Sequence, residues 1–556
     1  MLQLEMLLRK AKLYFDTVKY LRPVQLIGQI TKSRKLKRSY TQKGDIPHAF
    51  FPLSIFIEAL DGEEIYLQRF DVEAICRGEV ELLNESHRLD LNEWQIEASP
   101  LWRFNLHYFE YGIALAMAYQ KTRQHRFYDC FKTMLISWMQ VHEMPEGDAW
   151  HPYTISLRLP NWLIACEIFG DLFEQDADFK NRVFSSLYMQ YRTLLLRQET
   201  WNLGNHYLEN IKAALLGSIF FQEGKVFGQQ WELWIKELKE EILPDGFHFE
   251  LSPMYHKIIL EDLLRVAVVL KKLDSDKCLE IRPYIQKALN AAVFMEERCS
   301  RTLLFNDSGD NVARPWQLLC RACDEELAIS PETVMALPNA GYYKLQSENL
   351  VLVMDAGSIG PDYIPGHAHC DYMSYELFYQ GKPLFVNMGT GLYQGELRSF
   401  FRSTRAHNTV SINGHEQSEC WAEHRVARRI LLEGVECNLQ EIRGAYRNYL
   451  GEQHRRKLSM ENNSLYVIDS VEASGNFTVE SYLHIGPDFT ISDEEKIITI
   501  YKNGKRIGEI RPVDCNYEVG VQPYAPEFGD LRQAKVITFR WKGFGERGYI
   551  VEFEPD

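Results

Sequence analysis

Residues 366–408 read GHAHCDYMSYELFYQGKPLFVNMGTGLYQGELRSFFRSTRAHN and combine strand patterns with polar side chains. They open with a His-x-His-x-Asp motif made of His367, His369 and Asp371. If this piece is extended, side chains two positions apart share one face, so two imidazoles and a carboxylate converge. A single histidine at a sheet edge can merely satisfy backbone groups, but His407 adds a third histidine to the same strand-and-loop context. We therefore expect a metal site or a proton-transfer site here.

The strand pattern extends to both sides of this stretch, over residues 338–556. Apolar and polar residues alternate in GYYKLQ, NLVLVMDAG, SYELFYQGKPLFVN, LYVIDSVEA and FTVESYLHI. The Asn-Gly pairs at 413–414 and 503–504 are typical of two-residue hairpins. We predict an antiparallel β-sandwich domain over residues 337–556, with its boundary near Ala336–Asn339.

Residues 100–330 show the spacing of long helices instead. Their joining loops are short, which favours antiparallel neighbours in a bundle, a solenoid or a closed α/α toroid. We predict one helical domain over residues 46–336, preceded by a segment of residues 1–45 that comprises a helix and a basic linker. The helices are expected at 105–122, 126–142, 157–174, 178–198, 206–222, 227–241, 253–272, 278–297 and 315–327.

The composition excludes several classes of protein. A chain of 556 residues, 46% hydrophobic and 25% charged, is an ordinary globular protein with two to four domains. Its net charge of −15 and lack of a long basic run argue against a nucleic-acid binder, so an acidic substrate must be met by a local basic site. The sequence contains no run of eighteen apolar residues, so it predicts no membrane-spanning helix.

The eleven cysteines form no disulfide framework, and the Cys320-x-x-Cys323 pair has no second pair beside it. Free thiols favour a reducing compartment. The N-terminal residues contain charges every three or four positions and have no apolar core typical of a secretory signal. We expect a cytoplasmic protein.

Two motifs in the helical part carry groups suited to chemistry. Asn205 and His206 precede an apolar helix, where Asn205 can serve as the N-cap or the pair can present donors to a carboxylate. Further on, Ser252 and Pro253 predict a helix start that places Tyr255 in the first turn. A tyrosine there can have its phenolate stabilised by the helix dipole, although core tyrosines at helix starts are equally common.

Other segments combine aromatic rings with arginine or histidine at helix starts. Such groups suit sugar rings that carry carboxylates, although they can also be core and capping residues. The candidates for substrate contact are Arg103, Asn105, His107, Trp150, Arg158, Trp201, His256 and Arg405.

Taken in order, these motifs resemble the heparinase II/III-like polysaccharide lyases over residues 100–430. The matching pieces are LWRFNLHYF, WHPYTISLRLPNW, GNHYLEN, LPDGFHFELSPMYH, GHAHCDYMSYEL, PLFVNMGTG and FRSTRAHNTV. The resemblance implies an N-terminal α/α toroid followed by antiparallel β domains. It also implies β-elimination on a uronic-acid-containing polysaccharide, such as a glycosaminoglycan or alginate.

The resemblance assigns roles to individual residues. It implies that Asn205, with His206, neutralises the uronate carboxylate, that Tyr255 is the catalytic tyrosine, and that His367 completes the acid/base set. Which of Tyr255 and His367 removes the proton depends on the substrate epimer and stays open.

The resemblance also implies a divalent metal in the β domain, with His369 and His407 as ligands. The family places an aspartate at the third position, where this sequence has Asn387. An amide oxygen can ligate a hard cation, so calcium or manganese competes with zinc for a structural role.

Three other functions are weighed against the lyase. A uronate C5-epimerase uses the same proton abstraction, and a non-catalytic carbohydrate-binding protein of polysaccharide biosynthesis could share the scaffold without needing an acid/base set. A hydrolase would need paired carboxylates across the cleft. Glu209 and Glu250 are the nearest candidates, and neither has an obvious partner in the sequence.

Overall fold

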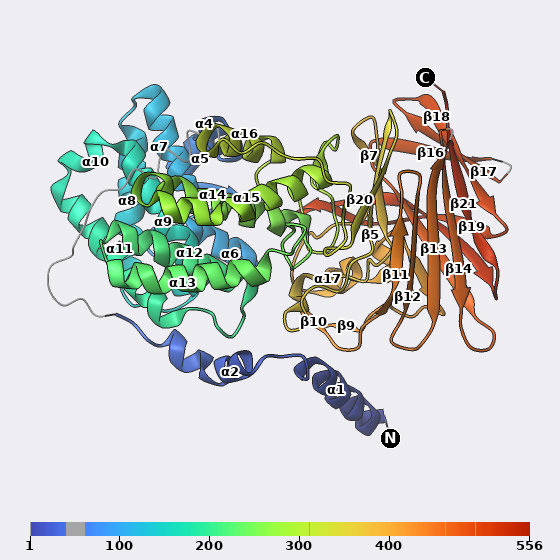
Figure 1. Cartoon of the computed structure of the whole chain (residues 1–556). Helices are drawn as coiled ribbons and strands as arrows, with labels where there is room; N and C mark the ends of the chain where they lie inside the picture. The colour runs from blue at the N-terminus through green and yellow to red at the C-terminus, as the bar shows by residue number, and fades with distance from the viewer. Residues whose placement is uncertain (1, 41–61, 311, 462, 495, 556) are drawn as a thin grey trace.

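The chain folds into a helical part followed by a β part (Figure 1). The computed structural model describes residues 2–40, 62–310, 312–461, 463–494 and 496–555. The last long helix, α16, ends at Leu327, and the first strand of the β part, β3, begins at Ala336. The predicted fold class, helical and then antiparallel β, is confirmed. The predicted domain boundary at residue 45 lies outside the described residues.

The helices fall close to the predicted ranges, with two notable breaks. The helix predicted at 105–122 is two helices, because Phe109 adopts a left-handed conformation with φ of 57° between them. The N-terminal helix is also divided, and its second half starts at Pro23 and extends into the segment predicted as a linker. The helices are α1 (Leu2–Val18), α2 (Pro23–Leu36), α4 (Gly62–Arg69), α5 (Val72–Cys76), α6 (Pro100–Tyr108), α7 (Glu110–Thr122), α8 (Arg126–Val141), α9 (Pro152–Phe169), α10 (Asp171–Gln175), α11 (Ala177–Arg197), α12 (Gly204–Phe220), α13 (Gly224–Glu241), α14 (Pro253–Leu273), α15 (Ser275–Glu296), α16 (Trp316–Leu327) and α17 (Glu396–Phe401).

The helical part has two layers. Helices α7, α9, α12 and α14 pack side by side, and α8, α11, α13 and α15 pack on their outer side. The inner helices are apolar around most of their circumference, as expected for helices covered on nearly all sides, and α9 and α12 bury most of their residues. The ends of α12 and α14 that face the β part carry the residues of the candidate site, Asn205 and Tyr255.

The β part is a sandwich of two antiparallel sheets. One sheet has the order β11-β12-β13-β14-β21-β18-β17-β16, and the other has β19-β20-β15-β7-β6-β5-β4-β3, with β8 pairing to β15. Apolar side chains from both sheets, including Leu352 and Leu377 from one and Leu458 and Val467 from the other, share a single core. At the predicted hairpin, Asn503 and Gly504 both have positive φ, as a two-residue turn between paired strands requires.

The strands are short in the first sheet-forming segment and longer toward the C-terminus. They are β1 (Glu79–Leu82), β2 (Glu85–Arg88), β3 (Ala336–Leu337), β4 (Tyr342–Gln346), β5 (Leu350–Asp355), β6 (Tyr375–Tyr379), β7 (Lys382–Phe385), β8 (Val410–Ile412), β9 (Cys420–Trp421), β10 (Arg425–Val426), β11 (Leu431–Cys437), β12 (Glu441–Arg447), β13 (Gln453–Glu461), β14 (Ser464–Glu472), β15 (Thr478–Ile485), β16 (Phe489–Glu494), β17 (Ile497–Lys502), β18 (Lys505–Val513), β19 (Asn516–Glu527), β20 (Asp530–Lys542) and β21 (Glu546–Phe553).

Helices α1 and α2 run along the lower edge of the molecule in Figure 1 and contact both parts. Gln25 of α2 reaches the backbone of the helical part at Asn202, and Thr17 of α1 bonds Trp421 of the β part. Within the described residues, no helix is both long and apolar enough to cross a bilayer.

Candidate active site

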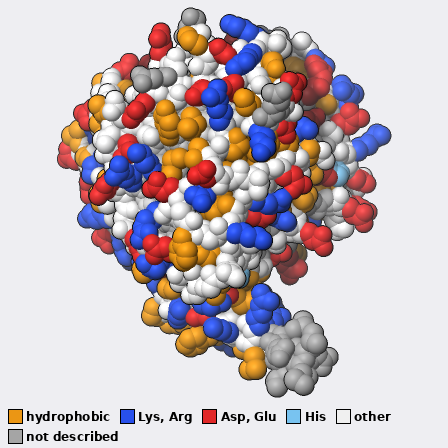
Figure 2. All heavy atoms as spheres, turned by 90° about the vertical axis from the view of Figure 1, so that its right-hand side faces the viewer, with side chains coloured by type: hydrophobic (Ala, Val, Ile, Leu, Met, Phe, Trp, Pro, Cys, Tyr) orange, Lys and Arg blue, Asp and Glu red, His pale blue; other side chains and the backbone are white. Residues whose placement is uncertain are grey.

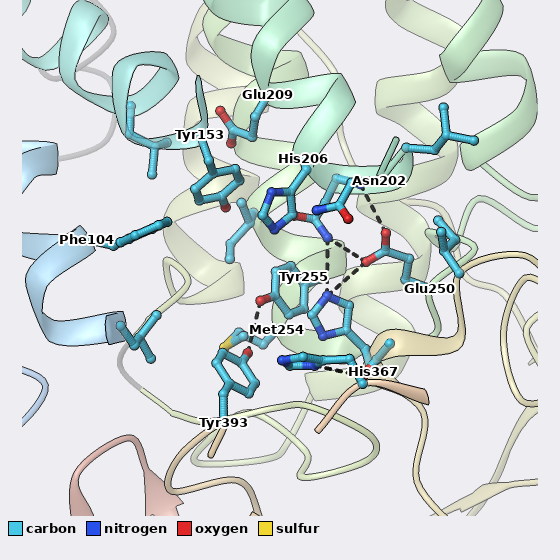
Figure 3. A pocket seen from close by; sticks show the side chains of 18 of the residues that line it. Phe104, Tyr153, Asn202, His206, Glu209, Glu250, Met254, Tyr255, His367 and Tyr393 are labelled. Carbon is cyan, nitrogen blue, oxygen red and sulfur yellow. Dashed lines mark hydrogen bonds and ion pairs between the residues drawn. The ribbon is translucent and has the colours of Figure 1, made fainter. Parts of the chain in front are cut away.

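A cavity of about 840 Å³ lies between the helical part and the β part. Helices α6, α9, α12 and α14 line one side, the loops around His367, Tyr393 and His424 line the other, and α1 and α2 contribute residues between Tyr14 and Gln29. Figure 3 shows that Asn202, His206, Tyr255, Glu250 and His367 come together on this surface from separate segments.

Asn205 is held in place by a buried carboxylate. Helix α12 begins at Gly204 with Leu203 as N-cap, so Asn205 is the second helical residue and not the N-cap that its position predicts. Glu250 Oε1 accepts from the backbone N–H of Asn205 at 3.0 Å, and Glu250 Oε2 accepts from Nδ2 at 2.7 Å. The side-chain oxygen of Asn205 is buried without a hydrogen-bond partner. Glu250 thereby fixes the orientation of the Asn205 amide.

His367 ends the short 3₁₀ helix η2 (Pro365–His367) and lies next to Asn205. Its Nδ1 is 2.9 Å from Asp307 Oδ2, which fixes Nδ1 as the donor when the ring is neutral. Its Nε2 lies 3.3 Å from Asn205 Nδ2 and 3.3 Å from Glu250 Oε2, at the cavity surface. With Nδ1 as the donor to Asp307, Nε2 is the unprotonated nitrogen of the neutral ring, and it faces the cavity beside the Asn205 amide.

Tyr255 stands in the first turn of α14, where Ser252 caps the helix by accepting from the Tyr255 N–H. Its ring packs on His367 with centroids 4.1 Å apart, and its hydroxyl is 3.0 Å from the hydroxyl of Tyr393. Burial raises the pKa of Tyr255 above its ordinary value, because an ionised phenolate would lose solvation. Burial therefore opposes the phenolate that the helix dipole would favour, and Tyr255 is a neutral phenol in the free protein.

His206 lies beside Asn205, with its ring 4.3 Å from that of Tyr153. Its Nδ1 is 3.2 Å from Oε1 of Glu199, a carboxylate buried completely. Burial by itself lowers the pKa of His206, but the charge and hydrogen bond of Glu199, together with the charges of Glu250 and Glu209, leave the pKa raised. The same pairing holds the pKa of Glu199 below its ordinary value against the opposing effect of its burial. Glu199 therefore favours the protonated form of His206 next to Asn205.

The two histidines of the His-x-His-x-Asp motif share one carboxylate. His367 bonds Oδ2 of Asp307, and His369 Nε2 lies 2.8 Å from Oδ1 of the same residue. Arg398 of α17, also buried, binds both oxygens of Asp307. The charge of Arg398 and the histidine hydrogen bonds outweigh the effect of burial and hold the pKa of Asp307 well below its ordinary value. Asp307 is thus an ionised support common to His367 and His369.

A buried group suited to a metal lies behind this support. His369, Asp371 and His407 each offer a ligand atom, and these atoms lie within 4.8 Å of one another. With Nε2 bonded to Asp307, the Nδ1 of His369 is buried without a partner, as expected for a nitrogen that would bind a cation. In this group, the carboxylate beside His369 and His407 is that of Asp371. Two imidazoles and a carboxylate fit a divalent transition metal.

Asn387, predicted as the third ligand, lies next to this group. Its Oδ1 accepts from Ser374 Oγ at 2.6 Å and lies 3.2 Å from Nδ1 of His407, whereas its Nδ2 is buried without a partner. His407 Nε2 is 3.1 Å from the carbonyl oxygen of Phe401. Asn387 therefore contacts His407, a candidate ligand, but the carboxylate of the candidate metal site comes from Asp371.

The candidates for substrate contact are distributed between the cavity, the core and the surface. Asn105 and Trp201 line the cavity. Arg103 is partly exposed and pairs with Asp148, and Arg405 is exposed with its guanidinium over the ring of Phe400. Neither arginine lines the cavity.

The remaining four candidates are core residues, so the prediction that they touch substrate is corrected. His107 is buried and accepts from Trp138 Nε1, while burial lowers its pKa. Arg158 bonds Gln190 and the backbone of His107. Trp150 and His256 are also buried and donate to backbone carbonyls, of His142 and Ala288 respectively.

Several supporting residues carry no recognisable signal in the sequence. Glu250 is predicted only as a hydrolase candidate, and no motif marks Glu199, Asp307 or Tyr393. Both hydrolase candidates are engaged, since Glu250 holds Asn205 and Glu209 pairs with Lys212 at 2.6 Å. No spacing signal links Asp307 to His367, because the two come together only through the fold.

A helical domain joined to an antiparallel β region, with asparagine, histidine and tyrosine in the cavity between them, is the arrangement that the resemblance to polysaccharide lyases implies. The chain belongs to the heparinase II/III family. The profile described as "Heparinase II/III N-terminus" matches residues 34–314, and "Heparinase II/III-like, C-terminal" matches residues 330–544.

The relatives are distant. A heparin-sulfate lyase of Pedobacter heparinus is 23% identical over 74% of this chain and 67% of its own length. A heparin-sulfate lyase of Bacteroides stercoris is 21% identical over 69% of this chain and 64% of its own length. Among solved structures, heparinase III has a TM-score of 0.70 at 16% identity, covering 95% of this chain and 89% of its own. At this identity the structural likeness establishes the fold.

Proposed function

We propose that the protein cleaves a uronic-acid-containing polysaccharide by β-elimination. The observation that carries this proposal is the convergence of Asn205, Tyr255 and His367 in one cavity, although they come from two helices and a loop of the β part. A protein that only binds sugar has no need for a neutral phenol packed against an oriented imidazole.

The reaction removes H5 of the uronate, and the charge that develops spreads onto the carboxylate oxygens. Asn205 and the cationic His206 lie side by side at the start of α12, where the helix dipole also favours an anion. A donor held in place for developing charge is worth about 3–4 kcal/mol of barrier lowering. Glu250 and Glu199 hold the two side chains in place before substrate arrives.

The protonation states of His367 and Tyr255 indicate which side chain removes the proton and which one donates it. His367 presents Nε2 to the cavity and is suited to accept H5, since its Nδ1 is tied to Asp307. Tyr255 stays protonated because burial raises its pKa, so it is suited to protonate the glycosidic oxygen. The C5–H and C4–O bonds break, a C4=C5 double bond forms, and no water enters the products.

The metal has a structural role in this proposal. His369, Asp371 and His407 would hold it, and bound there it would fix the loop that carries His367 by charge neutralisation and coordination. No step of the elimination passes through it.

The glycosaminoglycan class is favoured for the substrate because the two distant relatives are heparin-sulfate lyases. The test is ultraviolet absorbance after incubation with heparosan, heparan sulfate, hyaluronan, chondroitin and alginate. β-Elimination produces a 4,5-unsaturated uronate that absorbs, whereas hydrolysis and binding produce none. We expect absorbance to rise on at least one polymer with the wild-type protein and to stay flat with Tyr255→Phe. A flat trace on every polymer would contradict the proposal, and deuterium uptake at C5 from heavy water would then identify an epimerase.

A further inference from the structure

The N-terminal helices α1 and α2 are fixed to the body of the protein by their inner faces. Thr17 accepts from Trp421 Nε1 at 3.0 Å, and Gln25 donates to the Tyr363 carbonyl at 3.0 Å. Arg22 stacks on the Tyr363 ring at 3.6 Å. Gly28 packs so closely on Trp201 that a side chain there would meet Trp201 Cβ at 2.7 Å. These contacts hold the two helices in a defined orientation against the surface.

Their outer faces carry large apolar side chains in contact with solvent. Leu8 and Phe15 of α1 are 62% and 71% exposed, and Ile27 and Ile30 of α2 are 63% and 80% exposed. Exposed apolar groups on a folded protein need no explanation when they are scattered singly. Here they follow the helical period, seven residues apart in α1 and three apart in α2.

Basic residues continue the same stripes. In α1 and just after it, Lys12 and Lys19 follow Leu8 and Phe15 at four-residue spacing. In α2 and at its C-cap, Arg34 and Lys37 follow the two isoleucines in the same helical period, and all four basic residues are exposed. Figure 2 shows apolar and basic side chains gathered on the projection at the bottom of the molecule.

The charge of this segment is opposite to that of the whole chain. Residues 8–40 contain ten lysines and arginines and a single acidic residue, Asp16, in a protein with a net charge of −15. A helix with exposed apolar residues beside lysine and arginine is suited to lie in the interface of a bilayer that contains anionic lipid. We define the basic–apolar face as Leu8, Lys12, Phe15, Lys19, Ile27, Ile30, Arg34 and Lys37.

We propose that the basic–apolar face of α1 and α2 binds the surface of an anionic lipid bilayer. An acidic polysaccharide would satisfy the positive charges but would leave Phe15 and Ile30 in water, because it has no apolar surface to cover them. A second copy of this chain would cover the apolar groups but would bring two strongly basic segments together. A lipid surface satisfies both features, since apolar side chains enter the acyl boundary and basic ones meet the headgroups. The inference concerns attachment and does not depend on the proposed lyase activity.

The test is co-sedimentation of the full chain with phosphatidylcholine vesicles that contain or lack phosphatidylglycerol. We expect binding only to the anionic vesicles. The triple variant Lys12→Gln, Arg34→Gln and Lys37→Gln should weaken it at least about tenfold, because each basic residue near an anionic surface contributes measurably. The double variant Phe15→Ser and Ile30→Ser should weaken binding to a similar degree while leaving the charge unchanged. The matched control neutralises Lys272, Lys287 and Lys505, which are exposed elsewhere on the protein, and should bind as wild type does.

Circular dichroism and Tm of each variant should match wild type, because the replaced side chains are exposed. Absence of binding to anionic vesicles, or equal binding to both vesicle types, would overturn the proposal. Two other occupants of the face are tested separately: light scattering without vesicles detects self-association, and binding of heparan sulfate fragments detects a polyanion. A dimer that the Phe15→Ser and Ile30→Ser variant separates would assign the face to self-association. Binding to heparan sulfate fragments but not to vesicles would assign it to a polyanion.

Discussion

Glu250 accepts a hydrogen bond with each of its two oxygens from the same residue, Asn205, through the backbone N–H at 3.0 Å and the side-chain amide at 2.7 Å. The carboxylate thus acts as a clamp on the amide that is proposed to meet the uronate. Because both oxygens are occupied, Glu250 is an orienting group rather than the acid of a hydrolase.

Replacement of Glu250 with Ala should lower kcat/KM about tenfold to hundredfold, since a displacement of a positioned donor by about 1 Å costs that much. Asn205→Ala should cost about a hundredfold to a thousandfold, because it removes the donor itself. The fall is expected mainly in kcat, measured by ultraviolet absorbance over a range of substrate concentrations. Glu209→Gln is the matched control, because Glu209 also lines the cavity but pairs with Lys212 and not with Asn205. An equal loss in this control would contradict the role of the clamp.

Tyr255→Phe should lower kcat by about a hundredfold to ten-thousandfold, the range for loss of a general acid. Tyr393→Phe removes the hydroxyl 3.0 Å from that of Tyr255 and leaves the proton donor in place, so its effect should be much smaller. Initial rates on the best polymer of the panel measure both. If the two variants lost activity equally, Tyr393 would share the acid role and the assignment to Tyr255 alone would be wrong.

The activity should depend on the charge of His206. Burial lowers the pKa of His206, but Glu199, helped by the charges of Glu250 and Glu209, raises it by more, so the cationic form persists to higher pH than for an ordinary histidine. Binding of the anionic substrate should therefore hold below this raised pKa and weaken as the pH rises through it. The stability that the His206–Glu199 pair contributes should be lost over the same rise in pH.

The variant Glu199→Gln removes the carboxylate that raises the pKa of His206. The alkaline increase in KM should then begin at lower pH than in wild type. The pH dependence of KM in both proteins measures this shift, and thermal unfolding at each pH excludes loss of fold. An unchanged profile would show that His206 does not govern substrate binding.

The metal site predicts a response to chelation. Purified protein should contain a divalent metal by elemental analysis, and its removal should lower Tm because the buried imidazoles and the Asp371 carboxylate would lose their common partner. Asp371→Asn should reduce metal content and Tm together. Asn387→Asp is the informative counterpart, since the amide nitrogen of Asn387 has no hydrogen-bond partner to lose. It should retain metal more tightly than wild type, and a fall in metal content would show that Asn387 does not face the ion.

Arg158 and Arg103 test the distinction between core and surface. Arg158→Ala should lower the free energy of unfolding by about 3 to 5 kcal/mol, because it leaves a cavity and unpaired buried acceptors on Gln190 and His107. Arg103→Ala should cost about 0 to 1 kcal/mol, since its ion pair with Asp148 is partly exposed. Denaturant unfolding measures both. A raised KM in folded Arg158→Ala protein would restore the original prediction of substrate contact.

The architecture could be predicted from the sequence because the spacing of apolar residues, and the residues that begin or end helices and strands, are local features. The change from helical to alternating spacing lies between α16 and β3, and most helices fall within a few residues of their predicted ranges. The break at Phe109 was missed because nothing in an apolar helical run marks a left-handed residue.

The site was less predictable where partners are distant in sequence. Asn205, Tyr255 and His367 converge as expected, but the residues that orient them are 45 or more positions away, as Glu250 is from Asn205 and Asp307 is from His367. The sequence also contains no sign of which polar side chains are buried. Arg158 and His107 belong to residue types that usually contact ligands or solvent, yet here they form hydrogen bonds inside the helical core.

The shared carboxylate of Asp307 makes the cavity histidine and the metal-site histidine inseparable. His367 and His369 reach its two oxygens because they are two positions apart in the chain. Insertion or deletion of one residue between them would turn one ring away, and the proposed base or the ion would lose its support. The other walls of the cavity can vary without disturbing these contacts, but the two histidines and Asp307 can be changed only together.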